Sequence, residues 1–234
     1  MSAHAYSDVR ATGSLDVAAL RAGAWGLIAS FVAFVVGVVL SVATTGDRAR
    51  AEEAAADRLG VPIADLPALE LAKASEQFPP TEQDLVNVVL LVLATVIFAV
   101  AVAAARVGWL PTALAVLTPI GWSLYILLGT SLTSGAVPPE STLALYDAYA
   151  LPAMATSTAG GCLALIVFVL TLRSRGVARR SGIVVLVLAA LGAVAAVAFG
   201  VPPVLPMLLG TILGITLLRV REPDLAGSAR SAAP

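Results

Sequence analysis

Five long stretches of this 234-residue chain contain no charged residue. A helix needs about 20 mostly apolar residues to cross a hydrocarbon core about 30 Å thick. Each stretch reaches that length, and only 12% of the chain is charged, against about 25% in water-soluble domains. The chain is therefore predicted to be an all-α, polytopic integral membrane protein surrounded by the lipid bilayer. The charge-free stretches are 22–46, 85–105, 107–139, 148–172 and 181–218.

The last charge-free stretch is too long for one membrane helix, and it is interrupted by Gly200, Pro202, Pro203 and Pro206. Proline is tolerated in the first turn of a helix, where its missing N–H is not needed. We therefore expect a helical hairpin here and about six spans in total; one span followed by a re-entrant segment is the alternative. The expected spans, within a single transmembrane domain over 14–221, are 24–43, 85–105, 109–129, 151–172, 182–199 and 202–219.

The distribution of arginine predicts the orientation of the bundle, because short cytoplasmic loops are enriched in Lys and Arg. Four arginines crowd the loop between the fourth and fifth spans, whereas 130–150 and 200–205 contain neither basic residue. Six spans place both termini on one side, so we expect both to be cytoplasmic. The small, polar tails 1–13 and 222–234 are expected to be disordered. The four arginines are Arg173, Arg175, Arg179 and Arg180.

Two further features concern the cellular setting. Lys73 is the only lysine among many arginines, a bias that indicates a GC-rich bacterial genome and hence a bacterial inner (plasma) membrane. The first span has a competing interpretation as a secretory signal, because 41–43 resembles a small-residue cleavage site. Signal cores are typically about 7–15 residues long. The longer apolar run here favours a retained helix.

The segment 44–83 is expected to be an acidic loop outside the cytoplasm, with eight acidic and four basic residues. A short helix over 47–59 should end at Gly60, and a second should run from near Pro67 to about Gln77. Thr81 should then cap the second span. A solvated cover over the bundle is favoured over a lid or a partner-docking site. The acidic residues could instead bind a divalent cation, but the residue spacing of a calcium-binding loop is absent.

The segment 130–150 is expected to be a second outer loop. Asp147 lies four residues before the expected start of the fourth span, where a carboxylate complements the positive end of a helix dipole. That structural role is favoured over catalysis. An enzyme acting at the membrane surface through Glu140 and Asp147 is the third of the functional hypotheses.

The fourth span contains a run of small and polar residues over 156–162, and the third span contains Pro119 and Gly121. Small residues allow close helix approach and interhelical hydrogen bonds, and an internal proline weakens or kinks a helix. Together they predict a ligand cavity between the third and fourth spans; tight packing without a cavity is the alternative. The candidate cavity residues are Thr118, Pro119, Trp122, Ser123, Ser157 and Thr158.

Four glycines are predicted to be helix-packing positions. Gly160 and Gly161 belong to the small run of the fourth span, while Gly210 and Gly214 form a GxxxG pattern in the last. Such patterns allow backbones to touch. The contacts can lie within one chain or between chains, and the pattern does not distinguish the two.

Several sequence features are absent, and their absence narrows the range of possible functions. The spans carry no deep ionisable residue, which proton relays and ion-coupled transport usually require, and no basic face exists for nucleic acid. Neither a catalytic residue nor a metal or cofactor motif is identified. The first hypothesis is a non-catalytic helper or accessory subunit that associates with a second copy or another membrane protein. The alternative is a carrier or binder of a lipid or small uncharged solute through the predicted cavity.

Overall fold

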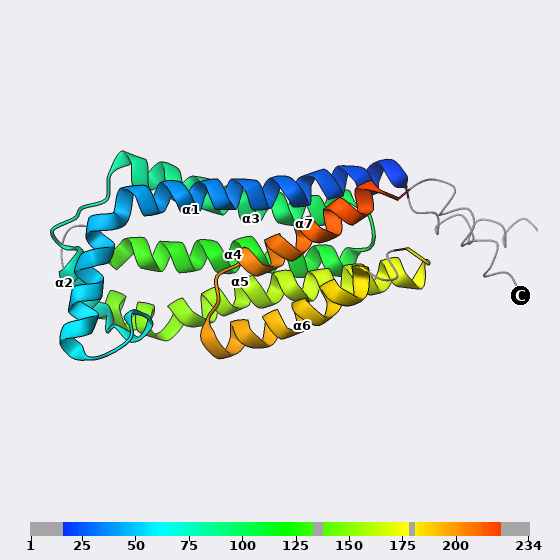
Figure 1. Ribbon diagram of the computed structural model, residues 1–234. Helices are drawn as coiled ribbons and strands as arrows, with labels where there is room; N and C mark the ends of the chain where they lie inside the picture. The colour runs from blue at the N-terminus through cyan, green and yellow to red at the C-terminus, as the bar shows by residue number, and fades with distance from the viewer. Residues whose placement is uncertain (1–15, 133–137, 178–180, 221–234) are drawn as a thin grey trace, which may run out of the picture.

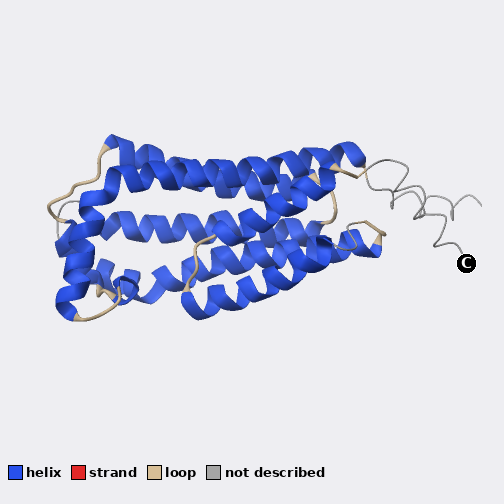
Figure 2. Cartoon of the chain, in the orientation of Figure 1, coloured by secondary structure: helices blue, strands red, loops and turns tan. Residues whose placement is uncertain are grey.

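The computed structural model of the protein describes residues 16–132, 138–177 and 181–220. Within these ranges all regular elements are helices, and no strand is present (Figure 2). The two tails expected to be disordered lie outside the described residues. The elements are α1 Val17–Leu59, the 3-10 helix η3 Ile63–Asp65, α2 Ala68–Ser75, α3 Glu82–Ala104, α4 Trp109–Leu132, α5 Glu140–Ser174, α6 Ser181–Phe199 and α7 Val204–Leu218.

Five of the described helices are long and apolar enough to cross a membrane: α1, α3, α4, α5 and α6. For the described residues, the prediction of an all-helical protein with several helices that could span a membrane is therefore confirmed. The last helix, α7, has 15 residues and is about 22 Å long, which is shorter than a hydrocarbon core of about 30 Å. The exact number of complete crossings stays a prediction.

The helices run along one common long axis (Figure 1). Helix α1 packs along α3 and α7, helix α5 packs along α4 and α6, and contacts between α3 and α4 join the two groups. The start of α1 and the end of α7 lie at the same end of the bundle, and α2 lies at the opposite end (Figure 1). We call this opposite end the α2 end.

Helix α1 is much longer than the expected first span, and the expectation of a separate helix over 47–59 is wrong. The helix continues without a break to Leu59 and then ends at Gly60, whose φ of 66° is left-handed. It bends before its last turns, which lie across the α2 end (Figure 1). The hydroxyls of Thr44 and Thr45 both donate to the carbonyl of Ser41, at 3.1 and 2.8 Å. Hydrogen bonds of this kind often bend helices.

Helix α5 also begins earlier than expected. It starts at Glu140, so the second half of the expected loop 130–150 is helical. Asp147 consequently lies about two turns inside the helix, and the prediction that it complements the helix dipole at the start of a span is wrong. Glu140 occupies the first turn instead.

Helices α6 and α7 form a hairpin that ends short of the α2 end (Figure 1). The break between them follows Phe199, and Gly200 there has a left-handed φ of 60°. The α2 end is therefore built from α1, α2, η3, α3, α4 and α5, and the hairpin turn lies further along the bundle from this end (Figure 1).

Candidate functional site

The predicted cavity residues lie at a close contact between α4 and α5. Ser157 and Thr118 are completely buried, and the Ser157 hydroxyl donates to the Thr118 carbonyl at 2.8 Å. A Cβ built on Gly121 would lie 2.5 Å from the carbonyl oxygen of Ala153 and 2.6 Å from the nitrogen of Ser157. The two backbones therefore touch at this level of the bundle.

Thr158, the next residue of α5, is held by a different element. Its hydroxyl donates to the carbonyl of Val201 in the α6–α7 turn. Two neighbouring hydroxyls thus join α5 to α4 on one side and to the hairpin turn on the other. Pro119 and Ser123 lie half-buried on α4. Whether these residues bind a ligand stays a prediction.

Two of the predicted residues carry buried polar atoms without a hydrogen-bond partner in the described part of the chain. These atoms are the Thr118 hydroxyl oxygen and the Trp122 indole nitrogen. Buried polar groups in proteins are usually paired. Trp122 stacks on Tyr125, with ring centroids 5.3 Å apart and planes at 25°, and lies 5.9 Å from Phe34.

The four predicted packing glycines face neighbours within their own chain. A Cβ added to any of them would meet another helix at between 2.6 and 3.2 Å. Gly160 lies against α4, Gly161 and Gly210 have neighbours on two elements, and Gly214 lies against the backbone of α1. The nearest neighbours are Leu117 for Gly160, Pro206 for Gly161, Leu27 for Gly210 and Ala24 for Gly214.

A pocket of about 750 Å³ lies at the α2 end, within the range of about 300–1,000 Å³ that is usual for small-molecule sites. We call it the α2-end pocket. It is bounded by α4 and α5, by the last turns of α1 with η3 and α2, and by the hairpin turn. None of the six predicted cavity residues lines it, but Tyr125 and Met154 do. These two lie about one helical turn from Trp122 and Ser157, toward the α2 end.

The lining of the α2-end pocket combines apolar and charged side chains. The apolar side chains come from α2, α3, α4, α5 and the turn after η3, which places hydrocarbon on several sides. The apolar lining includes Leu66, Leu71, Val88, Ile126, Leu151 and Met154. The charged and aromatic part comprises Arg48, Glu52, Asp65, Tyr125, Tyr146 and Asp147.

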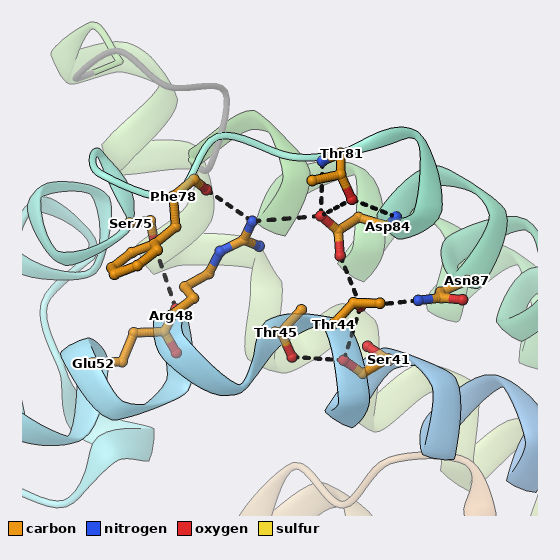
Figure 3. A network of polar contacts seen from close by, with 10 residues as sticks. All are labelled: Ser41, Thr44, Thr45, Arg48, Glu52, Ser75, Phe78, Thr81, Asp84 and Asn87. Carbon is orange, nitrogen blue, oxygen red and sulfur yellow. Dashed lines mark hydrogen bonds and ion pairs between the residues drawn. The ribbon is translucent and has the colours of Figure 1, made fainter.

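Arg48 belongs to a polar network that ties the last turns of α1 to the start of α3 (Figure 3). Its guanidinium donates to the carbonyl of Phe78 at 3.0 Å and lies 3.9 Å from the Asp84 carboxylate. Asp84 accepts hydrogen bonds from the backbone and the hydroxyl of Thr81, at 2.8 and 2.9 Å. Thr81 therefore caps α3 with a complete capping box, as predicted.

Thr44 extends the same network along α1. Its hydroxyl lies 3.0 Å from the Asp84 carboxylate and accepts from the amide of Asn87 at 3.1 Å. Asn87 is fully buried, so these contacts satisfy a polar group inside the bundle. The network fixes the direction in which α1 leaves the membrane-spanning part, and thereby the position of the pocket wall.

Glu52 lies on α1 beyond the bend and outside the charge-free stretch. Its carboxylate accepts a hydrogen bond from the Ser75 hydroxyl of α2 at 3.3 Å. Burial raises the pKa of Glu52 above its ordinary value of 4.5, while the Ser75 hydrogen bond and the nearby Arg48 charge act in the opposite direction. The carboxyl group is therefore held in the pocket wall at an electrostatic cost.

Asp65 and Asp147 are exposed at the pocket, and the described residues give neither of them an ion pair. Together with Glu52 they supply three carboxylates from three different elements. The acids do not form a metal-binding cluster, since no group of three His, Cys, Asp or Glu residues suited to a metal ion occurs in the described ranges.

Sequence reasoning missed this site because its residues come from separate segments. The available signals were the acidic segment 44–83 and the tyrosines near the expected membrane boundary, but neither identifies a common pocket. Comparisons with protein-family models, with curated proteins and with solved structures find no match to the chain.

Proposed function

We propose that this membrane protein binds or carries a small amphipathic molecule in the α2-end pocket. The observation that carries the proposal is the pocket itself: about 750 Å³, with apolar side chains from several helices and a few charged groups. This combination is typical of small-molecule sites, where apolar surface supplies affinity and a few polar groups supply orientation. The proposal develops the sequence hypothesis of a binder between the third and fourth spans, because α4 and α5 supply much of the lining.

The first sequence hypothesis, an accessory subunit that acts through helix association, receives less support. Its motivation was the set of small-residue helix faces together with the acidic outer segment and the lack of a reactive core. Gly160, Gly161, Gly210 and Gly214 meet neighbouring helices of the same chain, so these faces are already occupied. Association with a second copy or another membrane protein stays a prediction.

The proposed setting is a bacterial plasma membrane crossed about six times, with both termini in the cytoplasm. Arginine enrichment in the loop around 173–180 supports this orientation. The common location of the start of α1 and the end of α7 is compatible with an even number of crossings (Figure 1). In this orientation the α2-end pocket opens on the outer side of the membrane.

A tryptophan placed in the pocket tests the proposal. Gly129 lines the pocket, and a Cβ there meets nothing within 4 Å, so Gly129→Trp should fill the space without disturbing the helices. Leu127→Trp, on an exposed position of the same helix, is the matched control. Native mass spectrometry of gently released full chains should show a small-molecule adduct on the wild type and on Leu127→Trp. The adduct should be missing from Gly129→Trp.

Two results would count against binding in this pocket. One is a wild-type chain with no adduct in native membranes. The other is equal retention of the adduct by the Gly129→Trp variant, which would place the molecule elsewhere on the protein.

A further inference from the structure

We propose that the ligand of the α2-end pocket is a cationic amphiphile, an organic cation such as an ammonium group attached to an apolar body. This inference rests on the proposed function and names the chemical class of the ligand. It follows from three properties of the lining: its charge, its aromatic side chains and the separation of its carboxylates.

The charge of the lining is negative. Glu52, Asp65 and Asp147 are three carboxylates, and Arg48 is the one basic side chain that lines the pocket within the described residues. Glu52 lies near Arg48, whereas the described residues give Asp65 and Asp147 no ion pair. A carboxylate without a cationic partner favours a positive ligand, and in a partly apolar pocket this attraction is stronger than in water. An anionic ligand would face three like charges.

Arg48 is poorly placed to reverse this preference. Its guanidinium points toward Phe78 and Asp84 (Figure 3), donating to the Phe78 carbonyl and lying 3.9 Å from the Asp84 carboxylate. Its Nε atom is buried and has no hydrogen-bond partner in the described part of the chain. The Arg48 charge acts on two acids, Asp84, which does not line the pocket, and Glu52, which does.

The carboxylates fit an organic cation better than a metal ion. Oxygen-ligated metals need several ligands within about 2.6 Å of one centre. The three acids lie on α1, η3 and α5, and no metal-binding group of acids occurs among the described residues. A diffuse positive charge on a larger body can interact with separated carboxylates, because Coulomb attraction does not require direct coordination.

The aromatic side chains support the same class. Tyr125 and Tyr146 line the pocket together with Phe199, and aromatic rings attract cations through their negative faces. Tyr125 is held in place by stacking on Trp122. The apolar lining would then contact the hydrocarbon part of the ligand.

Two ions of the same shape and opposite charge test the inference directly. Tetraphenylphosphonium is a permanent cation and tetraphenylborate is the matching anion. Binding of each to the purified full chain in a nonionic detergent is measured by equilibrium dialysis, with Gly129→Trp as the blocked reference. Phosphonium should bind at least about tenfold more tightly, and Gly129→Trp should remove this binding.

Variants in which an acid is replaced by its amide show which carboxylates contribute to phosphonium binding. Asp147→Asn and Glu52→Gln should each weaken phosphonium binding about twofold to fivefold, the range expected for a partly exposed charge pair. The Gln side chain keeps an acceptor for Ser75, and thermal unfolding of each variant checks the fold. Asp57→Asn, an exposed acid of α1 outside the pocket, should bind phosphonium like the wild type.

The outcomes separate the two proposals. Equal binding of both ions overturns the cationic class, and so does phosphonium binding that is unchanged in the acid-to-amide variants. In either case the Gly129→Trp variant still tests whether the pocket binds a molecule. Failure of both ions to bind overturns the cationic class. If the wild-type chain from native membranes also carries no small-molecule adduct, the pocket function is overturned as well. Added phosphatidylethanolamine distinguishes the source of the cation: competition with phosphonium supports an aminolipid headgroup, and no competition supports a free organic cation.

Discussion

The hydroxyl of Ser157 donates a hydrogen bond to the main-chain carbonyl of Thr118 across the contact between α5 and α4, at 2.8 Å. Interhelical hydrogen bonds in membrane proteins contribute on average about 0.6 kcal/mol, and at most about 2. Ser157→Ala should therefore lower the free energy of unfolding by that amount in a detergent unfolding titration. Thr112→Ala, which removes only a local bond to the carbonyl of Gly108 just before α4, is the control and should have a smaller effect.

The close approach of α4 and α5 predicts a larger effect at Gly121. A Cβ there would lie 2.5 Å from the Ala153 carbonyl oxygen, and backbone atoms cannot move aside as a flexible side chain can. Gly121→Ala should destabilise the protein by about 1–3 kcal/mol, the usual cost of overpacking. Gly129→Ala on the same helix meets no neighbour and should leave the melting temperature unchanged or raise it slightly. Similar melting temperatures for both variants would contradict the packing described here.

The polar network around Asp84 predicts local opening when it is broken. Asp84→Ala removes the acceptor of Thr81 and the partner of Arg48, while the Thr81 hydroxyl can still accept from the backbone N–H of residue 84. We expect faster hydrogen–deuterium exchange in the last turns of α1 and at the start of α3, with little change in α5. Glu82→Ala, in the same first turn but outside the network, should leave exchange in α1 as in the wild type.

The position of Glu52 predicts a pH-dependent stability. Its pKa is raised in the folded protein by burial, so the folded chain binds a proton more readily than the unfolded chain does. The stability of the wild type relative to Glu52→Gln should therefore increase as the pH falls through the raised pKa, and it should level off below 4.5, the ordinary value. Thermal unfolding at a series of pH values measures this difference. A constant difference between the two proteins across that range would show that Glu52 is not held in a buried setting.

The membrane-spanning character of the chain could be predicted because it depends on local composition. A charge-free stretch of about 20 residues has few other stable surroundings. The Thr81 cap was likewise predictable, since a capping box is encoded within four residues.

The ends of α1 and α5 could not be derived from charge-free stretches. The last turns of α1 are charged and are held by distant contacts: Ala55 and Ala56 pack against Leu66, and Arg48 meets Asp84. For α5, a proline before Glu140 and an acidic first turn were available signals of a helix start. Both signals lie outside the charge-free stretch 148–172, on which the expected span was based.

The α2-end pocket depends on tertiary structure even more strongly, because seven separate helices and two connections between helices contribute to it. Side chains such as Asp65 and Tyr146 are 81 positions apart in the chain. No pattern within a short window predicts that they face one space. The predicted residues Trp122 and Ser157 fell one turn away because small and polar residues mark a close helix contact as readily as a cavity.

The short α6–α7 hairpin has a consequence for movement of a bound molecule. Phe199 and Gly200 line the pocket, and the Thr158 hydroxyl donates to the next carbonyl, that of Val201. A molecule passing through the protein would have to displace this turn. If the α2-end pocket binds a ligand as proposed, the hairpin turn would form part of the wall of the site, and a ligand could reach further along the bundle only after the hairpin had moved.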